Sequence, residues 1–230
     1  EVKGNPKSLY SRVLMSSIID QTVEFVKHTL KDAEAGHDWW HILRVWNNAK
    51  LIGQSENADM LVVELAALLH DIADSKFHKG DETIGPKLAG DFLRSIEVQE
   101  VVIEHVQNII ENMSFKSSLG TTVRFQSLEI QIVQDADRLD AIGAIGIARA
   151  FTYGGYKNRE MYNPDIKPEL NMSKEEYKNS TAPTINHFHE KLLLLKDRMN
   201  TDTGRQIAIE RHQFMETYLE QFNNEWNGNQ

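Results

Sequence analysis

Apolar residues recur every three or four positions along most of the chain, the spacing that places them on one face of an α-helix. The pattern predicts helices over residues 8–29 (two helices if Ser16-Ser17 interrupts the first), 38–53, 57–70, 82–94, 98–112, 127–151, 187–199 and 205–226. Alternating apolar and polar residues, which are typical of a half-buried strand, are nearly absent. The sequence therefore predicts an all-α fold.

Polar segments separate these predicted helices. Residues 73–81 and 114–126 are expected to be loops, and residues 153–182 form a longer excursion that contains Gly154-Gly155 and lacks clear periodicity. Long loops in a compact domain are often functional. No change of composition marks a linker, so we expect residues 1–230 to form a single domain.

The most apolar predicted helix ends in a group of polar residues. Residues 61–69 are almost entirely apolar, and His70 and Asp71 follow directly, with Asp74 and Lys76 just beyond. A helix that is apolar on all sides is normally buried. Imidazole and carboxylate groups at its end then need hydrogen-bonding partners, water or a metal ion.

Two further residues complete a candidate metal site. His41 lies on the predicted helix 38–53, and Asp137 lies in the apolar helix 127–151. Together with His70 and Asp71 they offer nitrogen and oxygen donors, which suit Mn²⁺, Fe²⁺, Co²⁺, Ni²⁺ or Zn²⁺ better than Mg²⁺. Taken singly, each residue also has a structural explanation: a histidine can cap a core, and a buried acid can pair with an arginine such as Arg138.

Composition narrows the class of protein. Hydrophobic residues make up 40% of the 230 positions and charged residues 26%, which is ordinary for a globular protein. A formal net charge of −9 argues against a nucleic-acid polymer as partner. The absence of cysteine excludes disulfides and thiolate metal sites. Without an apolar run long enough to span a membrane, or a signal-peptide pattern at the N-terminus, we expect a cytoplasmic protein with no membrane partner.

Three motifs resemble the HD-domain superfamily of metal-dependent phosphohydrolases, and in particular its bacterial YpgQ/YedJ-type hydrolases. The motifs are residues 37–45, 64–76 and 133–149, and the resemblance covers about residues 20–226. It implies a single HD-domain helical bundle, with a core over about 20–155 and C-terminal helices over about 184–226 packed on it. It also implies one divalent metal ion, with Mn²⁺ favoured, held by His41, His70, Asp71 and Asp137.

The resemblance implies an activity as well. YpgQ-type hydrolases are associated with manganese-dependent cleavage of nucleoside triphosphates to monophosphate and pyrophosphate. The alternatives are a nucleoside monophosphate phosphatase and a non-catalytic nucleotide sensor that uses the HD pocket. Alarmone hydrolysis is disfavoured because the expected Glu-Asp pair after the His-Asp motif is missing, and cyclic-dinucleotide hydrolysis because the Gly-Tyr-Pro signature is missing.

Several residues near the predicted ligands are candidates for handling the substrate. Asp74 follows His70 by four residues, the spacing at which several HD hydrolases carry an acid that aligns water or moves its proton. Lys76, Arg44 and His37 are the expected phosphate contacts, and Tyr153 is expected to approach a base or sugar. The expected partner is a small nucleotide, and the expected assembly is a monomer or a homodimer.

Overall fold

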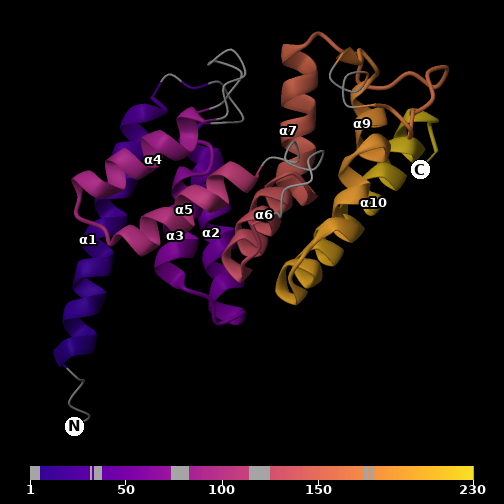
Figure 1. Cartoon of the computed structure of the whole chain (residues 1–230). Helices are drawn as coiled ribbons and strands as arrows, with labels where there is room; N and C mark the ends of the chain where they lie inside the picture. Colours follow the sequence, from indigo (N-terminus) through magenta and orange to yellow (C-terminus); the bar gives the residue numbers. More distant parts are fainter. Residues whose placement is uncertain are drawn as a thin grey trace. The chain divides into compact units, whose positions relative to one another are not determined.

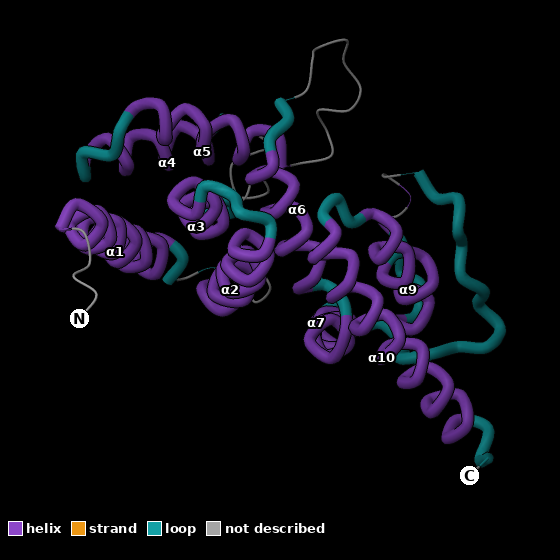
Figure 2. The backbone as a smooth tube through the Cα atoms, turned by 90° about the horizontal axis from the view of Figure 1, so that it is seen from below, coloured by secondary structure: helices purple, strands orange, loops and turns teal. Residues whose placement is uncertain are grey.

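The computed structural model describes residues 6–31, 33, 38–73, 83–113, 125–173, 176 and 179–229, with side chains from residue 13 onward. All regular structure in these ranges is helical, without a strand (Figure 2), which confirms the predicted all-α class. No helix within them combines the length and hydrophobicity that crossing a lipid bilayer requires. The chain divides into two compact units, Glu1–Ala136 and Asp137–Gln230, so its organisation as a single domain stays a prediction.

The first unit is built around one short central helix, α3. Its helices are α1 (Pro6–Thr29), α2 (Trp39–Ser55), α3 (Met60–Leu69), α4 (Ile84–Ser95), α5 (Glu100–Met113) and the larger part of α6 (Leu128–Asp140). Helix α3 packs against α1, α2 and α5, while α4 lies along α5 (Figure 1). The most apolar helix predicted from the sequence is therefore the core of this unit.

The sequence of α3 explains its central place. Seven of its residues are buried: Val62, Val63, Leu65, Ala66, Ala67, Leu68 and Leu69. Burying each valine or leucine side chain contributes about 1.5–3 kcal/mol, so neighbours on all sides fix this helix. The Asp59 carboxylate caps its start by accepting from the backbone N–H groups of Leu61 at 3.1 Å and Val62 at 3.3 Å. His70 and Asp71 thus follow a firmly held helix.

Helix α2 is tied to its neighbours by two side-chain hydrogen bonds. The Trp46 indole Nε1 donates to Glu64 Oε2 on α3 at 2.8 Å. The Asn48 amide donates to the carbonyl of Ala136 on α6 at 3.3 Å. Each bond joins a part-buried group to a partner more than 15 residues away in the chain, so α2 is fixed against both helices.

The second unit contains the end of α6, α7 (Gly143–Tyr156), α9 (Thr184–Glu190), the 3₁₀-helix η2 (Leu192–Arg198) and α10 (Asp202–Trp226). Helix α7 packs against α10 and α9 (Figure 1). The helix η2 packs against the same two helices. The rings of Phe151, Phe188 and Tyr218 meet at the centre of this packing, with centroids 5.9–6.2 Å apart. Aromatic contacts therefore join α7, α9 and α10.

Three predicted elements differ from the structure. The single helix predicted over residues 187–199 is the short helix α9 followed by the 3₁₀-helix η2, which begins at Leu192. The single helix predicted over residues 127–151 is two helices, because α6 ends at Asp140 and α7 begins at Gly143. Gly143 has φ +74°, a left-handed conformation that glycine adopts without steric cost. The excursion predicted from residue 153 begins later, because α7 continues to Tyr156.

Replacing Gly143 with alanine is expected to lower the free energy of unfolding by about 2 kcal/mol, because the new Cβ is strained at this positive φ. The added Cβ atom would also lie 3.0 Å from Cγ of Arg211. The matched control is Gly155→Ala on the same helix, where nothing lies within 4 Å. Alanine there is expected to leave stability unchanged or raise it by up to about 1 kcal/mol. Urea unfolding followed by circular dichroism measures the stability of both variants. Equal changes in the two would contradict the role of the left-handed Gly143 in the break between α6 and α7.

Candidate metal centre

Three of the predicted ligands meet in the first unit. The donor atoms of His41, His70 and Asp71 all lie within 4.8 Å of one another. His41 comes from the first turn of α2, whereas His70 and Asp71 end α3. The geometry therefore brings together residues that are about 30 positions apart in the sequence.

His41 is held by the start of its helix. Asp38 is the N-cap of α2, and its carboxylate accepts the backbone N–H of His41 at 3.0 Å. The His41 side chain is 3% exposed, so it points into the unit rather than into water. The cap was not among the predicted site residues, although an aspartate three residues before the histidine is a recognisable capping pattern.

His70 is oriented by a backbone contact. Its Nδ1 lies 2.9 Å from the carbonyl oxygen of Ala67 in the last turn of α3. A carbonyl only accepts, so Nδ1 carries the proton and Nε2 keeps its lone pair. Metal-binding histidines almost always have such a contact on the second ring nitrogen. The rings of His41 and His70 meet edge to face, with centroids 5.6 Å apart.

The cluster fits a divalent transition-metal ion. Two ligands on opposite sides of an ion, each at about 2.1 Å, are about 4.2 Å apart. The 4.8 Å limit of this cluster is close to that value, so small side-chain rotations are enough to converge on one ion. Two imidazoles and a carboxylate suit Mn²⁺, Fe²⁺, Co²⁺, Ni²⁺ or Zn²⁺.

The other predicted site residues fall in three groups. Arg44 is half-buried on α2, three residues after His41 and therefore adjacent to it on the helix surface. Asp137, half-buried in the last turn of α6, and Tyr153, 51% exposed on α7, belong to the second unit. The third group, His37, Asp74 and Lys76, lies outside the described residues.

The acids near Asp137 are partly structural, and their partners were not predicted. The Asp140 side chain is 2% exposed and forms an ion pair with Arg149, which also donates to the Asp140 carbonyl at 3.2 Å. Arg211 on α10 donates to the carbonyl of Leu139 at 2.6 Å. These bonds satisfy carbonyls that a helix end leaves without partners in the helix. Arginines thus brace the turn of α6 that carries Asp137.

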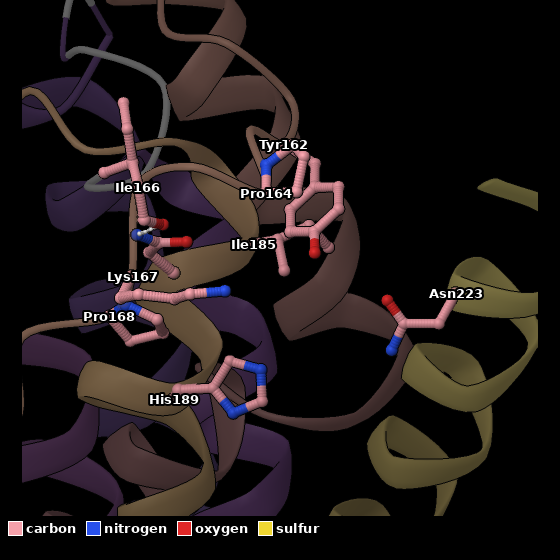
Figure 3. A pocket seen from close by; sticks show the side chains of 9 residues that line it. Tyr162, Pro164, Ile166, Lys167, Pro168, Ile185, His189 and Asn223 are labelled. Atoms are coloured by element: carbon pink, nitrogen blue, oxygen red, sulfur yellow. Dashed lines mark hydrogen bonds between the residues drawn. The ribbon is translucent and has the colours of Figure 1, made fainter. Parts of the chain in front are cut away.

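A small pocket of about 160 Å³ opens in the second unit (Figure 3). Its walls carry the polar side chains of Tyr162, Lys167, His189 and Asn223, which point toward the hollow. The remaining lining residues are Pro164, Ile166, Pro168, Ile185 and Asn186. The pocket is thus lined by different residues from those predicted for the metal site and its substrate.

His187, on α9, has a lowered pKa. Burial, followed by the positive charges of Lys191 and Arg159, lowers the pKa of His187 to about 4. The imidazole is therefore neutral at physiological pH. Two positive charges thus act on one half-buried ring, although the whole chain carries −9.

The low pKa of His187 predicts a pH-dependent stability. Between pH 6.5 and 4 the unfolded chain binds a proton at His187 that the folded chain does not, so stability falls as the pH falls through this window. For a half-buried ring the loss is about 2 kcal/mol. His187→Gln is expected to remove that part of the slope, measured by urea unfolding at pH 7 and pH 4.5. His189→Gln, at an exposed position of the same helix, is the control, and an equal change in both variants would contradict the assignment.

The helical fold and the cluster of His41, His70 and Asp71 match a known family. Residues 39–142 match the model of the HD domain. The chain belongs to this family and is a metal-dependent phosphohydrolase of the HD superfamily.

Individual relatives extend over most of the chain. The Bacillus subtilis protein YpgQ is 39% identical over 204 residues, which are 88% of this chain and 90% of YpgQ. A crystal structure of an HD-superfamily hydrolase from Bacillus thuringiensis has a TM-score of 0.75 at 44% identity, covering 93% of this chain and 98% of that one. The crystal structure of YpgQ in complex with ADP has a TM-score of 0.72 at 38% identity, covering 92% of this chain and 96% of that one. The predicted resemblance is therefore confirmed.

Proposed function

We propose that this phosphohydrolase cleaves (deoxy)nucleoside triphosphates to the monophosphate and pyrophosphate with one divalent metal ion, preferentially Mn²⁺. The observation that carries the proposal is the convergence of His41, His70 and Asp71, with the His70 tautomer fixed for ligation through Nε2. Asp137 is the proposed fourth ligand. It directly follows Ala136, whose carbonyl is hydrogen-bonded to the helix that carries His41.

The choice of a nucleotide has support from a relative. YpgQ, at 38% identity, has been crystallised in complex with ADP. A nucleoside triphosphate adds a third phosphate, so that cleavage of the anhydride bond between the α- and β-phosphates, which ADP also contains, releases pyrophosphate. The substrate class therefore agrees with a ligand that a close relative holds.

In the proposed reaction the chain positions the phosphates and moves one proton. When bound, the metal ion polarises a phosphoryl oxygen and lowers the pKa of a coordinated water. Asp74 would accept the proton of the attacking water as the water oxygen bonds to the α-phosphorus. The bond between the α-phosphorus and the bridging oxygen breaks, and pyrophosphate leaves with the electron pair. Lys76, Arg44 and His37 bind the phosphate oxygens.

Product analysis tests this proposal. The full chain is incubated with Mn²⁺ and a panel of nucleoside tri-, di- and monophosphates, and phosphate and pyrophosphate are detected separately. The expected result is pyrophosphate in equal amount to the monophosphate, with no free phosphate. Asp71→Asn, which keeps the side-chain volume but removes the charge, is expected to lose the activity.

Two outcomes would contradict the proposal. Release of phosphate from nucleoside monophosphates would instead identify a nucleotidase. Tight nucleotide binding without turnover, under every divalent metal in the series, would identify a nucleotide sensor.

A further inference from the structure

The C-terminal end of α7 presents two exposed tyrosines beside two cationic side chains. Tyr153 is 51% exposed and Tyr156 is 71% exposed. Lys157 Nζ lies 5.0 Å from the ring centroid of Tyr156 and 5.7 Å from that of Tyr153. The guanidinium carbon of Arg159 lies 5.5 Å from the Tyr153 centroid. These four residues are called the tyrosine–cation cluster below.

The backbone beneath the cluster is held in place. A Cβ atom on Gly154 would lie 2.1 Å from Oγ1 of Thr184, so the end of α7 approaches α9 as closely as only glycine permits. The backbone N–H of Arg159 donates to the Gly154 carbonyl at 2.9 Å, and its guanidinium donates to the Ser180 carbonyl at 2.5 Å. The cluster is therefore anchored to packed helices rather than carried by a free loop.

The cluster itself carries two positive charges, those of Lys157 and Arg159, and Glu160 follows in the sequence. The positive charge of Arg159 also reaches α9, where it contributes to the lowered pKa of His187. A guanidinium has five N–H donors, and the bond to Ser180 uses one of them. Arg159 thus retains the donor geometry that binds phosphate oxygens in pairs.

We propose that the tyrosine–cation cluster is a nucleotide-binding site of the second unit, with the base stacked on a tyrosine ring and the phosphates bound by Lys157 and Arg159. Bases stack on aromatic side chains largely irrespective of their identity. Cation–π contacts at exposed positions are weak, so both cations can exchange them for a phosphate. The choice of a nucleotide rests on the proposed function, whereas the exposed rings and the cations are given by the geometry.

Metal-free binding separates this site from the metal centre. The full chain in EDTA is titrated calorimetrically with ADP, adenosine and pyrophosphate. ADP is expected to bind, and adenosine and pyrophosphate each to bind at least about tenfold more weakly, because each offers only half of the contacts. Tyr153→Ala and Lys157→Glu are each expected to weaken ADP binding at least about tenfold. His70→Ala, which alters the metal cluster alone, is expected to bind ADP like the unaltered chain.

Lys167→Glu is the matched control, because it changes an exposed lysine of the same unit that lines the separate pocket (Figure 3). Loss of ADP binding in this variant, rather than in Lys157→Glu, would overturn the inference and place the ligand in the pocket. Turnover of nucleotides without any ADP binding in EDTA would also overturn it, while leaving the proposed function intact. ADP binding that depends on Tyr153 and Lys157, without turnover under any metal, would support the site and contradict the proposed function.

Discussion

Replacing His70 with alanine is expected to reduce hydrolysis of a nucleoside triphosphate by more than about 100-fold. Removing a residue that only hydrogen-bonds to a metal ligand already costs about 10–100-fold, and His70 is itself a proposed ligand. The His70 ring supplies a donor atom within 4.8 Å of those of His41 and Asp71. Its tautomer is set by the carbonyl of Ala67, so alanine removes both the donor and its orientation. Steady-state rates at saturating Mn²⁺ measure the effect.

The control for this substitution is His189→Ala, at an exposed histidine outside the cluster. Circular dichroism separates a lost ligand from a lost fold, because His70 caps α3 without being one of its buried core residues. Asp71→Asn provides a second variant if His70→Ala does not fold. Undiminished hydrolysis in both folded variants would contradict the assignment of the metal centre.

Replacing Arg149 with methionine is expected to lower the free energy of unfolding by about 3 kcal/mol, because it leaves the buried Asp140 carboxylate without its ion-pair partner. The Asp140 side chain is 2% exposed, so water cannot substitute for the guanidinium. Arg211 contributes a second positive charge near Asp140, which keeps the loss at the lower end of the range for such pairs. Urea unfolding measures the change.

Two further variants decide the cause of that loss. Arg149→Met combined with Asp140→Asn is expected to be more stable than Arg149→Met alone, because the uncompensated charge is gone. Arg94→Met breaks the pair of Arg94 with Glu100 on the surface, where water screens the charges, and is expected to change stability little. If Arg149→Met proves as mild as Arg94→Met, the pair does not stabilise the end of α6.

The helices were largely predictable because they depend on local patterns, and the ligands His41, His70 and Asp71 because their motifs resemble the HD family. The apolar run of α3 predicts a buried helix, and the His-Asp pair at its end is read directly from the sequence. The tautomer of His70 and the Asp38 cap that holds His41 were not predicted, although both partners lie three residues away in the chain.

The break between α6 and α7 could not be predicted, because apolar residues continue through it at helical spacing. The left-handed φ of Gly143 and its contact with Arg211, 68 positions later, determine the break. The role of Arg149 follows from it, since the turn after Asp140 lets Arg149 reach back to that acid. Likewise, the contact of Gly154 with Thr184 depends on a segment 30 residues away, which no local pattern encodes.

The most direct test of the proposed metal centre is the binding of Mn²⁺ itself, which is measured by the electron paramagnetic resonance signal of the free ion. The full chain is expected to bind one Mn²⁺, and Asp137→Asn is expected to weaken that binding at least about tenfold while the helix content stays unchanged. The control is Asp165→Asn, at an exposed position of the second unit. Asp135 lies nearer in the sequence but is fully buried, so its replacement would also affect stability. Mn²⁺ binding that is equally tight in Asp137→Asn and in the unaltered chain would contradict the proposed set of ligands.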